Sequence, residues 1–381
     1  MITSKSILIT IDVEDWFQVE NFKPWIPFET WGHHELRVER NVHLLLDLFD
    51  EFEVRGQKTE DRNQGSNFRR QKKVGTRHRR NMSDHFHLEN DLDKKKSEKS
   101  SKSCPKETNK NRIKATFFVL GWLADRLPGL VRDIQSRGHE VASHGYNHHL
   151  PDQLSAAEIR VDLTESKKRL EDLTGSTVSG YRAPSFAIND DILKIIEDCG
   201  YRYDSSYNSF GLHGRYGRIS LNGAGKLGVA HKISDTFFEL PISNLSIKNP
   251  LSFQLSAFSS ERNVKKSMVS KSFVLPWGGG GYFRLAPYRF FRRGVQSILE
   301  NHGAYAFYLH PWEIDPDQPR VREASTNFKF RHYTNLNKTR AKLKCLIESF
   351  DHCQFETCGE YLERVGWHKE NEKGRAKGEL G

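Results

Sequence analysis

The sequence predicts an α/β fold, a (β/α) barrel whose active site lies at the carboxyl ends of its strands. Three observations favour this fold. Strand-type and helix-type segments alternate along most of the chain. A unit of helix, glycine and short strand recurs at Gly138, Gly200 and Gly303, where glycine suits the left-handed conformation that ends a helix. Polar residues repeatedly follow the strands, and in parallel α/β folds the chemistry gathers at that end.

The expected elements can be placed in order along the chain. A β-branched strand covers Ser6–Ile11 and ends in carboxylates, and apolar spacing predicts a helix over Val42–Phe52. Ala115–Leu120 is a continuous apolar run, which is typical of a strand buried on both faces. Further expected elements are an amphipathic helix over Ala156–Leu173, a strand towards Gly180–Ala183, a strand over Phe237–Ile242 and C-terminal helix over Lys338–Val365.

The net charge of +10 is concentrated in one stretch of the chain. Residues 55–113 hold 18 Lys and Arg against 8 Asp and Glu, and the other residues hold 41 of each sign. The stretch is poor in aliphatic residues, so it cannot bury enough apolar surface to fold. We expect one domain over 1–365, interrupted by this disordered basic insertion, and a disordered tail over 366–381. The insertion is either a solvated loop or a tether for anionic polymer or membrane phosphate. The neutral remainder argues against a nucleic-acid-binding protein.

Cysteine usage and the chain's start limit the remaining classes. The five cysteines are scattered and form no CxxC pair, which argues against a disulfide framework and a cysteine zinc site. The start has neither the apolar core nor the cleavage site of a signal peptide. No stretch approaches the roughly 18 apolar residues of a membrane helix. We therefore expect a cytoplasmic protein without a membrane span.

Two clusters point to a metal site. His144 and His148 are four residues apart at a predicted strand end, where two imidazoles can reach one ion, although His149 could replace His148 as the second ligand. Asp12, Glu14 and Asp15 follow the first strand, and strand alternation places Asp12 and Glu14 on the same face. Two histidines and one carboxylate, with open positions for water and substrate, make a hydrolytic metal site.

Three further strand ends carry candidate catalytic groups. His310 follows an apolar strand and precedes a proline, a placement that suits a general acid at the rim or a structural histidine. Arg182 could orient a catalytic carboxylate, and Asp204 could pair with a histidine or an arginine. The alternative for Arg182 and Asp204 is an ion pair buried between strands.

Candidate substrate contacts gather around a glycine run. Four glycines follow Trp277 and precede Tyr282, without the lysine and the strand–helix context of a phosphate loop. Exposed backbone beside aromatic rings suits a sugar groove, although a flexible loop fits equally well. The candidate substrate-binding residues are Trp16, Tyr181, Pro184, Trp277, Gly279, Gly280, Tyr282 and Trp312.

In order and spacing, the motifs TIDVED, SHGYNHH, YRAPSF, YDSS and YLHPWE resemble those of the NodB-homology polysaccharide deacetylases. The similarity is strongest to the bacterial branch associated with exopolysaccharide and exosortase gene clusters. It covers most of residues 5–365 outside the basic insertion, with a second insertion at about 252–272. It implies a seven- or eight-stranded distorted barrel and one divalent metal ion, usually Zn²⁺. It also implies hydrolysis of the acetamido group of N-acetylhexosamine units in a polysaccharide or oligosaccharide.

The resemblance also assigns roles. Asp12 would be the general base, Arg182 would orient it, and His310 would be the acid. His144 and His148 would be metal ligands. Many relatives have adjacent aspartates after the first strand, whereas this chain has Asp-Val-Glu-Asp, so the carboxylate ligand is Glu14 or Asp15, and same-face geometry favours Glu14. The alternatives are an allantoinase-like hydrolase of a small amide and a carbohydrate-binding relative without activity.

Overall fold

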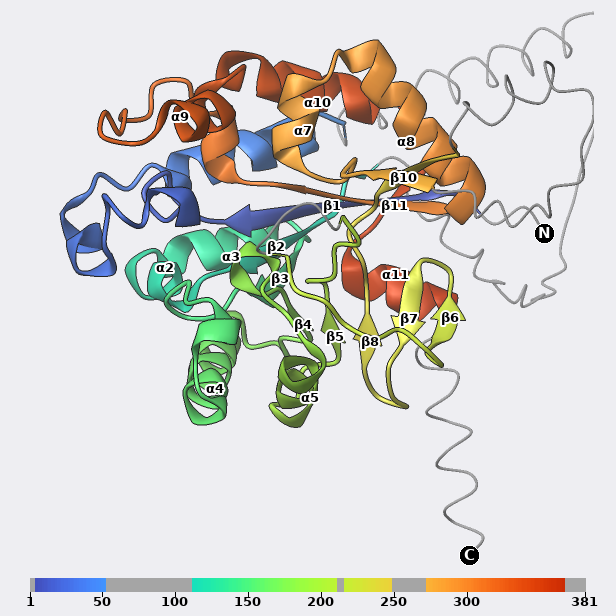
Figure 1. The fold of residues 1–381 in the computed structure, drawn as a ribbon, viewed down its shortest axis with the longest axis horizontal. Coiled ribbons are helices and arrows are strands. Elements are labelled where there is room, and N and C mark those ends of the chain that lie inside the picture. The colour runs from blue at the N-terminus through green and yellow to red at the C-terminus, as the bar shows by residue number, and fades with distance from the viewer. Residues whose placement is uncertain (1–3, 53–111, 211–215, 249–271, 367–381) are drawn as a thin grey trace, which may run out of the picture.

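A computed structural model describes residues 4–52, 112–210, 216–248 and 272–366 (Figure 1). The predicted insertions over 55–113 and about 252–272 and the predicted tail over 366–381 fall almost entirely outside the described residues. Among the described residues, no helix combines the length and the apolar character needed to cross a lipid bilayer.

The core of the fold is a sheet of mostly parallel strands in which β1 (Ser6–Val13) pairs with β11 (Ala304–Leu309) on one side and β2 (Ala115–Val119) on the other. Every residue of β1 is buried, as expected for a strand covered on both faces. In spatial order the parallel strands are β11, β1, β2, β3 (Glu140–Ser143), β4 (Gly180–Tyr181), β5 (Tyr203–Asp204) and β8 (Phe238–Glu239). The antiparallel hairpin β6 (Gly225–Leu227) and β7 (Ala230–Lys232) extends the β8 edge and was not predicted.

Backbone hydrogen bonds bridge the gap between the two ends of this parallel arrangement. The amide of Ser243, just after β8, donates to the carbonyl of Ala306 on β11 at 3.2 Å. The amide of Tyr308 on β11 donates to the carbonyl of Gly278 at 2.8 Å. The strands β9 (Leu245–Lys248) and β10 (Ser272–Leu275) pair separately in this region. The predicted distorted (β/α) barrel is confirmed.

Helices cover the outside of the sheet. Figure 1 shows α7, α8 and α10 beside β1 and β11, with α4 and α5 on the opposite side. The helices are 38–52, α2 (Gly121–Arg126), α3 (Pro128–Ser136), α4 (Ala156–Thr174), α5 (Asp190–Asp198), α7 (Gly280–Leu285), α8 (Tyr288–His302), α9 (Thr326–Tyr333), α10 (Leu336–Ser349) and α11 (Cys358–Val365). Short 3-10 turns are η1 (Glu20–Phe22), η2 (Phe28–His33), η3 (Pro151–Gln153), η4 (Pro184–Phe186) and η5 (Pro311–Ile314).

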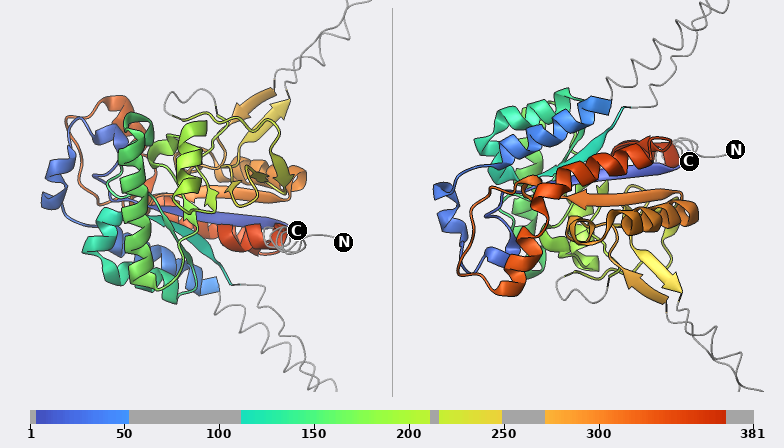
Figure 2. Two further views of the ribbon diagram at one scale, coloured as in Figure 1. Left: turned by 90° about the horizontal axis from the view of Figure 1, so that it is seen from below. Right: turned by 90° about the horizontal axis from the view of Figure 1, so that it is seen from above.

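The local signals in the sequence account for most helix ends. Gly138, Gly200 and Gly303 have φ of 77°, 78° and 76° at the ends of α3, α5 and α8, which confirms the left-handed stops. The helix expected over 338–365 is instead two helices, α10 and α11. They are separated by β12 (Gln354–Phe355), because these residues pair with the start of β1. Figure 2 shows β1 and β11 running side by side through the molecule.

Candidate active site

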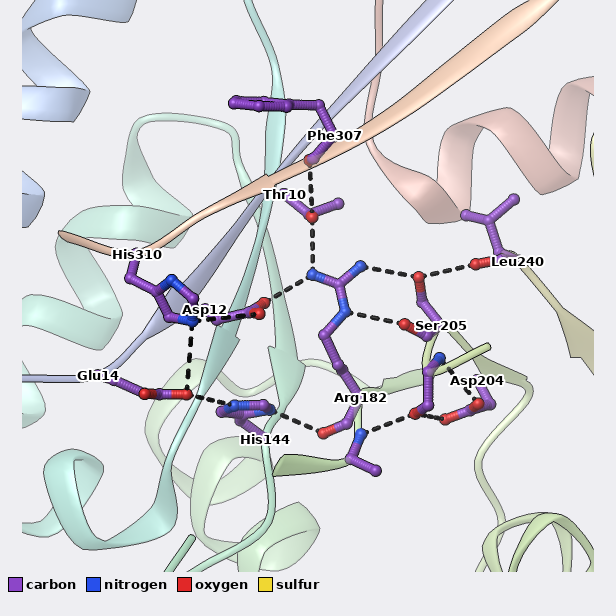
Figure 3. A network of polar contacts seen from close by, with 12 residues as sticks. Thr10, Asp12, Glu14, His144, Arg182, Asp204, Ser205, Leu240, Phe307 and His310 are labelled. Carbon is purple, nitrogen blue, oxygen red and sulfur yellow. Dashed lines mark hydrogen bonds and ion pairs between the residues drawn. The ribbon is translucent and has the colours of Figure 1, made fainter. Parts of the chain in front are cut away.

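The carboxyl ends of four parallel strands meet at one cavity of about 300 Å³. Asp12 and Glu14 come from the end of β1, and His148 follows β3. Arg182 follows β4, and His310 follows β11. These side chains converge although up to about 300 residues separate them in sequence, as Figure 3 shows for most of them. The structure therefore brings these residues together at the carboxyl ends of the parallel strands, as predicted.

Glu14, His144 and His148 form a buried cluster with the composition of a metal site. Nε2 of His144 lies 2.9 Å and Nε2 of His148 lies 3.0 Å from the same oxygen, Oε1 of Glu14. One ligand atom from each residue lies within 4.8 Å of the others, and all three residues are buried. His149, the alternative ligand, lies outside this cluster, and its ring is 5.8 Å from that of Phe28.

The hydrogen bonds of His144 test whether this cluster fits a cation. Nδ1 of His144 lies 2.8 Å from the carbonyl oxygen of Arg182. A carbonyl only accepts, so Nδ1 carries the proton and Nε2 of the neutral ring presents a lone pair. That lone pair faces the carboxylate of Glu14, a repulsive arrangement that a cation between them would make favourable. Metal-ligating histidines are commonly oriented by such a carbonyl, so the residues present fit a divalent metal ion.

The charges in the cluster also favour ionised Glu14. Burial opposes ionisation, but the charges of His148 and His310 and the hydrogen bond from His148 hold the pKa of Glu14 well below its ordinary value. Burial similarly opposes protonation of His148, and the charge and hydrogen bond of Glu14 raise the pKa of His148. Glu14 therefore presents a carboxylate to the cluster.

Asp15 points away from the histidines. Its Oδ2 accepts hydrogen bonds from the amides of Arg37 and Val38 at 2.7 and 2.9 Å, and its Oδ1 accepts from the amide of Trp16. Burial raises the pKa of Asp15 to about 6 against these hydrogen bonds. Asp15 thus holds the chain entering the helix over 38–52, and Glu14 is the carboxylate that meets the histidines.

Arg182 and Asp12 form a buried ion pair beside the cluster. Nη1 of Arg182 donates to Oδ1 of Asp12 at 2.6 Å and to the hydroxyl of Thr10 at 2.7 Å. Its Nε and Nη2 donate to the carbonyl and hydroxyl oxygens of Ser205. The hydroxyl of Thr10 donates a hydrogen bond to the carbonyl of Phe307, and the hydroxyl of Ser205 donates one to the carbonyl of Leu240 (Figure 3). The guanidinium is thereby fixed by strands on both sides, and it fixes Asp12 in turn.

His310 lies across the cavity from this pair. Its Nε2 is 3.9 Å from Oδ2 of Asp12 and 3.8 Å from Oε1 of Glu14. Its Nδ1 is 2.9 Å from Oε1 of Glu313. Burial lowers the pKa of His310, but the charges of Glu14, Glu313 and Asp12 outweigh burial and raise it to about 9. The ring therefore presents a proton on Nε2 towards the cavity at neutral pH.

Asp204 makes a separate set of hydrogen bonds. Its carboxylate accepts hydrogen bonds from the hydroxyl and the amide of Ser206, at 2.6 and 2.9 Å, and it neighbours Glu239 in register on β8. Burial raises the pKa of both carboxyl groups. Arg182, the arginine expected as a possible partner of Asp204, directs its Nη1 to Asp12 instead, and its charge lowers the pKa of Asp204 against the effect of burial. Asp204 does not line the cavity.

The predicted substrate contacts divide into two groups. Tyr282 and Trp312 line the cavity. The residues that do not line it are Trp16, Tyr181, Pro184, Trp277, Gly279 and Gly280. Of these six, Trp16, Tyr181, Pro184 and Trp277 are buried, and a role for the six in substrate binding stays a prediction. The indole of Trp277 donates to the carbonyl of Phe291 on α8.

Close packing explains the glycine run better than an exposed loop does. A methyl group at Gly278 would lie 2.7 Å from the carbonyl oxygens of Ala306 and Ser243, and one at Gly279 would lie 2.8 Å from the hydroxyl of Tyr308. The backbone there needs glycine in order to reach β11 and close the barrel.

Sequence reasoning missed several residues of the cavity wall. Phe186, Tyr216, Tyr308, Arg284 and Glu313 all line it. Glu313 had a local signal, because it lies three residues after His310, the spacing at which its carboxylate accepts the amide of His310. Tyr216 and Arg284 had none, since packing of distant segments places them.

Two family models match separate parts of the chain. Residues 101–203 match "Polysaccharide deacetylase", a stretch that includes His144, His148 and Arg182. This stretch resembles a polysaccharide deacetylase. Residues 264–362 match a domain of unknown function (DUF3473), a stretch that includes His310. Asp12 and Glu14 lie outside both matches.

Curated relatives agree with the first match. The chain is 31% identical over 91 residues to a peptidoglycan-N-acetylglucosamine deacetylase of Bacillus cereus, which is 24% of this chain and 42% of that protein. It is 31% identical over 103 residues to a peptidoglycan deacetylase of Helicobacter pylori (26% and 35%) and 30% identical over 89 residues to a chitooligosaccharide deacetylase of Azorhizobium caulinodans (23% and 42%). The chain spans less than half the length of these relatives. The similarities each concern about a quarter of this chain, and the stretch that matches the family model carries His144 and His148.

One solved structure is similar along nearly the whole chain. It is that of a candidate polysaccharide deacetylase from Mycobacterium smegmatis, with a TM-score of 0.49 and 16% identity over 97% of this chain and 93% of that one.

Proposed function

We propose that this protein is a metal-dependent deacetylase that hydrolyses the acetamido group of N-acetylhexosamine units in a polysaccharide. The observation that carries the proposal is the shared cavity. There, the Glu14–His144–His148 cluster lies beside Asp12, whose carboxylate is held by Arg182. His310 lies on the opposite side, with its Nε2 within 4 Å of the Asp12 carboxylate. Metal-assisted hydrolysis of an unactivated amide uses these three functions, namely an electrophilic ion, a base and an acid.

The donor set favours zinc among divalent ions. Imidazole nitrogen and carboxylate oxygen are ligands that Zn²⁺ accepts, and three protein ligands leave a position open, as catalytic zinc sites do. We propose Glu14, His144 and His148 as those ligands. A divalent ion held there would polarise the amide carbonyl and lower the pKa of a water molecule.

The protein's own residues supply the proton transfers. Asp12 has Oδ1 paired with Arg182, and its Oδ2 is the oxygen nearer to His310. Oδ2 takes a proton from the water whose oxygen attacks the acetyl carbonyl carbon. As the C–N bond breaks, Nε2 of His310 gives its proton to the departing nitrogen, since an amine anion is a very poor leaving group. The products are acetate and a free amino sugar.

The names of the matched relatives indicate which polymers to test as substrates. The curated proteins that match are named for peptidoglycan and chitooligosaccharides. Resemblance to the exopolysaccharide-associated branch adds N-acetylated exopolysaccharide as the third polymer to test. Tyr282 and Trp312, which line the cavity, are our candidate contacts for a sugar ring.

The experiment is acetate release with metal analysis. Purified protein is offered peptidoglycan, chitooligosaccharides, an N-acetylated exopolysaccharide and allantoin, and its metal is measured by mass spectrometry. We expect acetate from at least one glycan, roughly one metal ion per chain, and loss of both in His144→Ala. His149→Ala is the matched control and should retain the metal. Turnover of allantoin alone would indicate the small-amide hydrolase, and no turnover with glycan binding would indicate an inactive relative.

A further inference from the structure

The support of His310, whose role as the acid rests on the proposed function, comes from the carboxylate of Glu313. Glu313 is 1% exposed and lies between His310 and Arg284. Its Oε1 is 2.9 Å from Nδ1 of His310, and its Oε2 accepts from Nε of Arg284 at 2.6 Å. Oε1 also accepts the backbone amide of His310 at 3.1 Å. Both the ring and the backbone of His310 are therefore held by one carboxylate.

Arg284 is itself held firmly. It is 4% exposed, and its Nη1 donates to the carbonyls of His332 and Thr334, at 2.9 and 2.8 Å. Its Nη2 donates to the carbonyl of Arg331 at 2.9 Å. These carbonyls lie at the end of α9, so one guanidinium joins α7, α9 and the carboxylate of η5. Lysine could not reproduce this planar set of contacts.

Gly280 provides the space that Glu313 occupies. A methyl group at Gly280 would lie 2.6 Å from Oε2 of Glu313 and closer still to Oε1. Real Cβ atoms do not approach carboxylate oxygens so closely, so any side chain at Gly280 must displace Glu313. The third glycine of the run is thus linked to the orientation of His310 through a single carboxylate.

These contacts all come from the stretch that matches the domain of unknown function. Gly280, Arg284, His310 and Glu313 lie within residues 264–362. We propose that this stretch provides the proton-donor half of the active site, with Arg284 and Gly280 as positioning residues that act on His310 through Glu313. It is part of the catalytic barrel, because its strand β11 pairs with β1 from Ser6↔Ala304 to Ile11↔Leu309.

Mispositioning the proton donor has a distinct kinetic signature. Departure of an amine needs a proton, whereas nitrophenolate leaves an acetate ester without one. Arg284→Gln, Glu313→Gln and Gly280→Ala should therefore lower kcat for acetamide hydrolysis about 10- to 100-fold, the usual effect of removing a group that orients a site residue. Hydrolysis of 4-nitrophenyl acetate, KM for the glycan and metal content should change less than about twofold. Each rate is expressed per metal-loaded enzyme, which removes the effect of a misfolded fraction.

Matched variants and a double substitution sharpen the test. Arg293→Gln removes an exposed arginine of α8, and Gly129→Ala adds a methyl where nothing lies within 4 Å; both should behave as the wild type. Because Arg284 acts through Glu313, the double variant Arg284→Gln/Glu313→Gln should be no slower than Glu313→Gln. Arg284→Lys should not restore the rate.

A second measurement does not depend on activity. In protein labelled with ¹⁵N-histidine, the Nδ1 proton of His310 should give a downfield resonance, identified by its loss in His310→Gln. The resonance should shift or disappear in Arg284→Gln and persist in Arg293→Gln. Equal losses of amide and ester hydrolysis in Arg284→Gln, or an unchanged resonance, would overturn the inference while leaving the deacetylase intact. A wild type that releases no acetate from any glycan would instead refute the proposed function and this catalytic role with it.

Discussion

Nη1 of Arg182 lies 2.6 Å from Oδ1 of Asp12, with the arginine 0% and the aspartate 2% exposed. Removing one member of a buried pair leaves a charge without its partner, which usually costs about 3–5 kcal/mol. We therefore expect Arg182→Gln to lower the free energy of unfolding by that amount in urea denaturation. The exposed pair Arg160–Asp198 provides the control, and Arg160→Gln should cost no more than about 1 kcal/mol. Equal effects of the two changes would contradict this account of the pair.

Asp12→Asn is predicted to separate catalysis from folding. The amide can still accept the hydrogen bond from Arg182, but it cannot take a proton from water. We expect kcat to fall about 10²- to 10⁴-fold, the usual contribution of a positioned base, with metal content unchanged. Acetate release and metal analysis on the same preparation measure both. Loss of metal in Asp12→Asn would mean that Asp12, rather than Glu14, is the carboxylate ligand.

Glu14→Gln and Asp15→Asn should fail in different ways. Glu14 meets both histidines, so Glu14→Gln should lose the metal and the activity together. Asp15 accepts backbone amides of Arg37 and Val38, so Asp15→Asn should lower the melting temperature and retain the metal. Incubating the wild type with a chelator should reproduce the Glu14→Gln result, and adding Zn²⁺ back should reverse only the chelator's effect. Loss of metal in Asp15→Asn alone would make Asp15 the ligand.

His139 gives a prediction about pH and stability, away from the active site. Burial and the nearby charges of Arg112, Arg137 and Lys114 lower the pKa of His139 from 6.5 to about 4, and its Nδ1 accepts the amide of Ala115. Between these two values the unfolded chain binds more protons than the folded protein does. The stabilisation is therefore complete above about pH 6.5 and is lost as the pH falls to about 4.

The size of this effect is on the order of 3 kcal/mol, at about 1.4 kcal/mol for each pKa unit. His139→Gln, which keeps an acceptor without titrating, should flatten the dependence of unfolding free energy on pH in that window. His352→Gln is the control, because its side chain is 66% exposed. An unchanged pH dependence in His139→Gln would show that His139 has the same pKa in the folded and the unfolded protein.

Gly278 tests the closure of the barrel. A methyl group there would meet the carbonyls of Ala306 and Ser243 at 2.7 Å, which lie on the two edges that the local hydrogen bonds join. Overpacking of this kind typically costs about 1–3 kcal/mol. We expect Gly278→Ala to be less stable than the wild type by that amount in denaturant, with Gly129→Ala unchanged. Equal stability of the two variants would mean that the closing segment shifts freely.

The sequence was most informative about the polar residues that lie at the carboxyl ends of the strands. Asp12, Glu14, His144 and Arg182 could be placed because strand phase and parallel order fix which end of the sheet each side chain reaches. Asp204 obeys the same rule and still misses the cavity, since its carboxylate is held by Ser206, two residues along the chain. Strand position alone does not show which neighbour a buried acid will meet.

Aromatic residues beside glycines were the least predictable. A tryptophan beside four glycines gives the same sequence pattern whether it faces a sugar or packs in the core. In the structure Trp277 packs against Phe291, with ring centroids 5.3 Å apart. Arg284 escaped prediction for the same reason, because its contact with Glu313 spans 29 residues and depends on how α7 docks. The local sequence pattern does not indicate how a helix docks against distant parts of the chain.

Asp12 and Glu14 lie at the end of β1, which falls outside both matched stretches and pairs with β2 of one stretch and β11 of the other. The side chains of the two stretches therefore meet around a strand that belongs to neither. Transplanting 264–362 from a relative would place a foreign β11 against this chain's β1. Such chimaeras should fold and turn over only when the graft preserves the pairing from Ser6↔Ala304 to Ile11↔Leu309, so the unit of exchange among relatives is larger than either match.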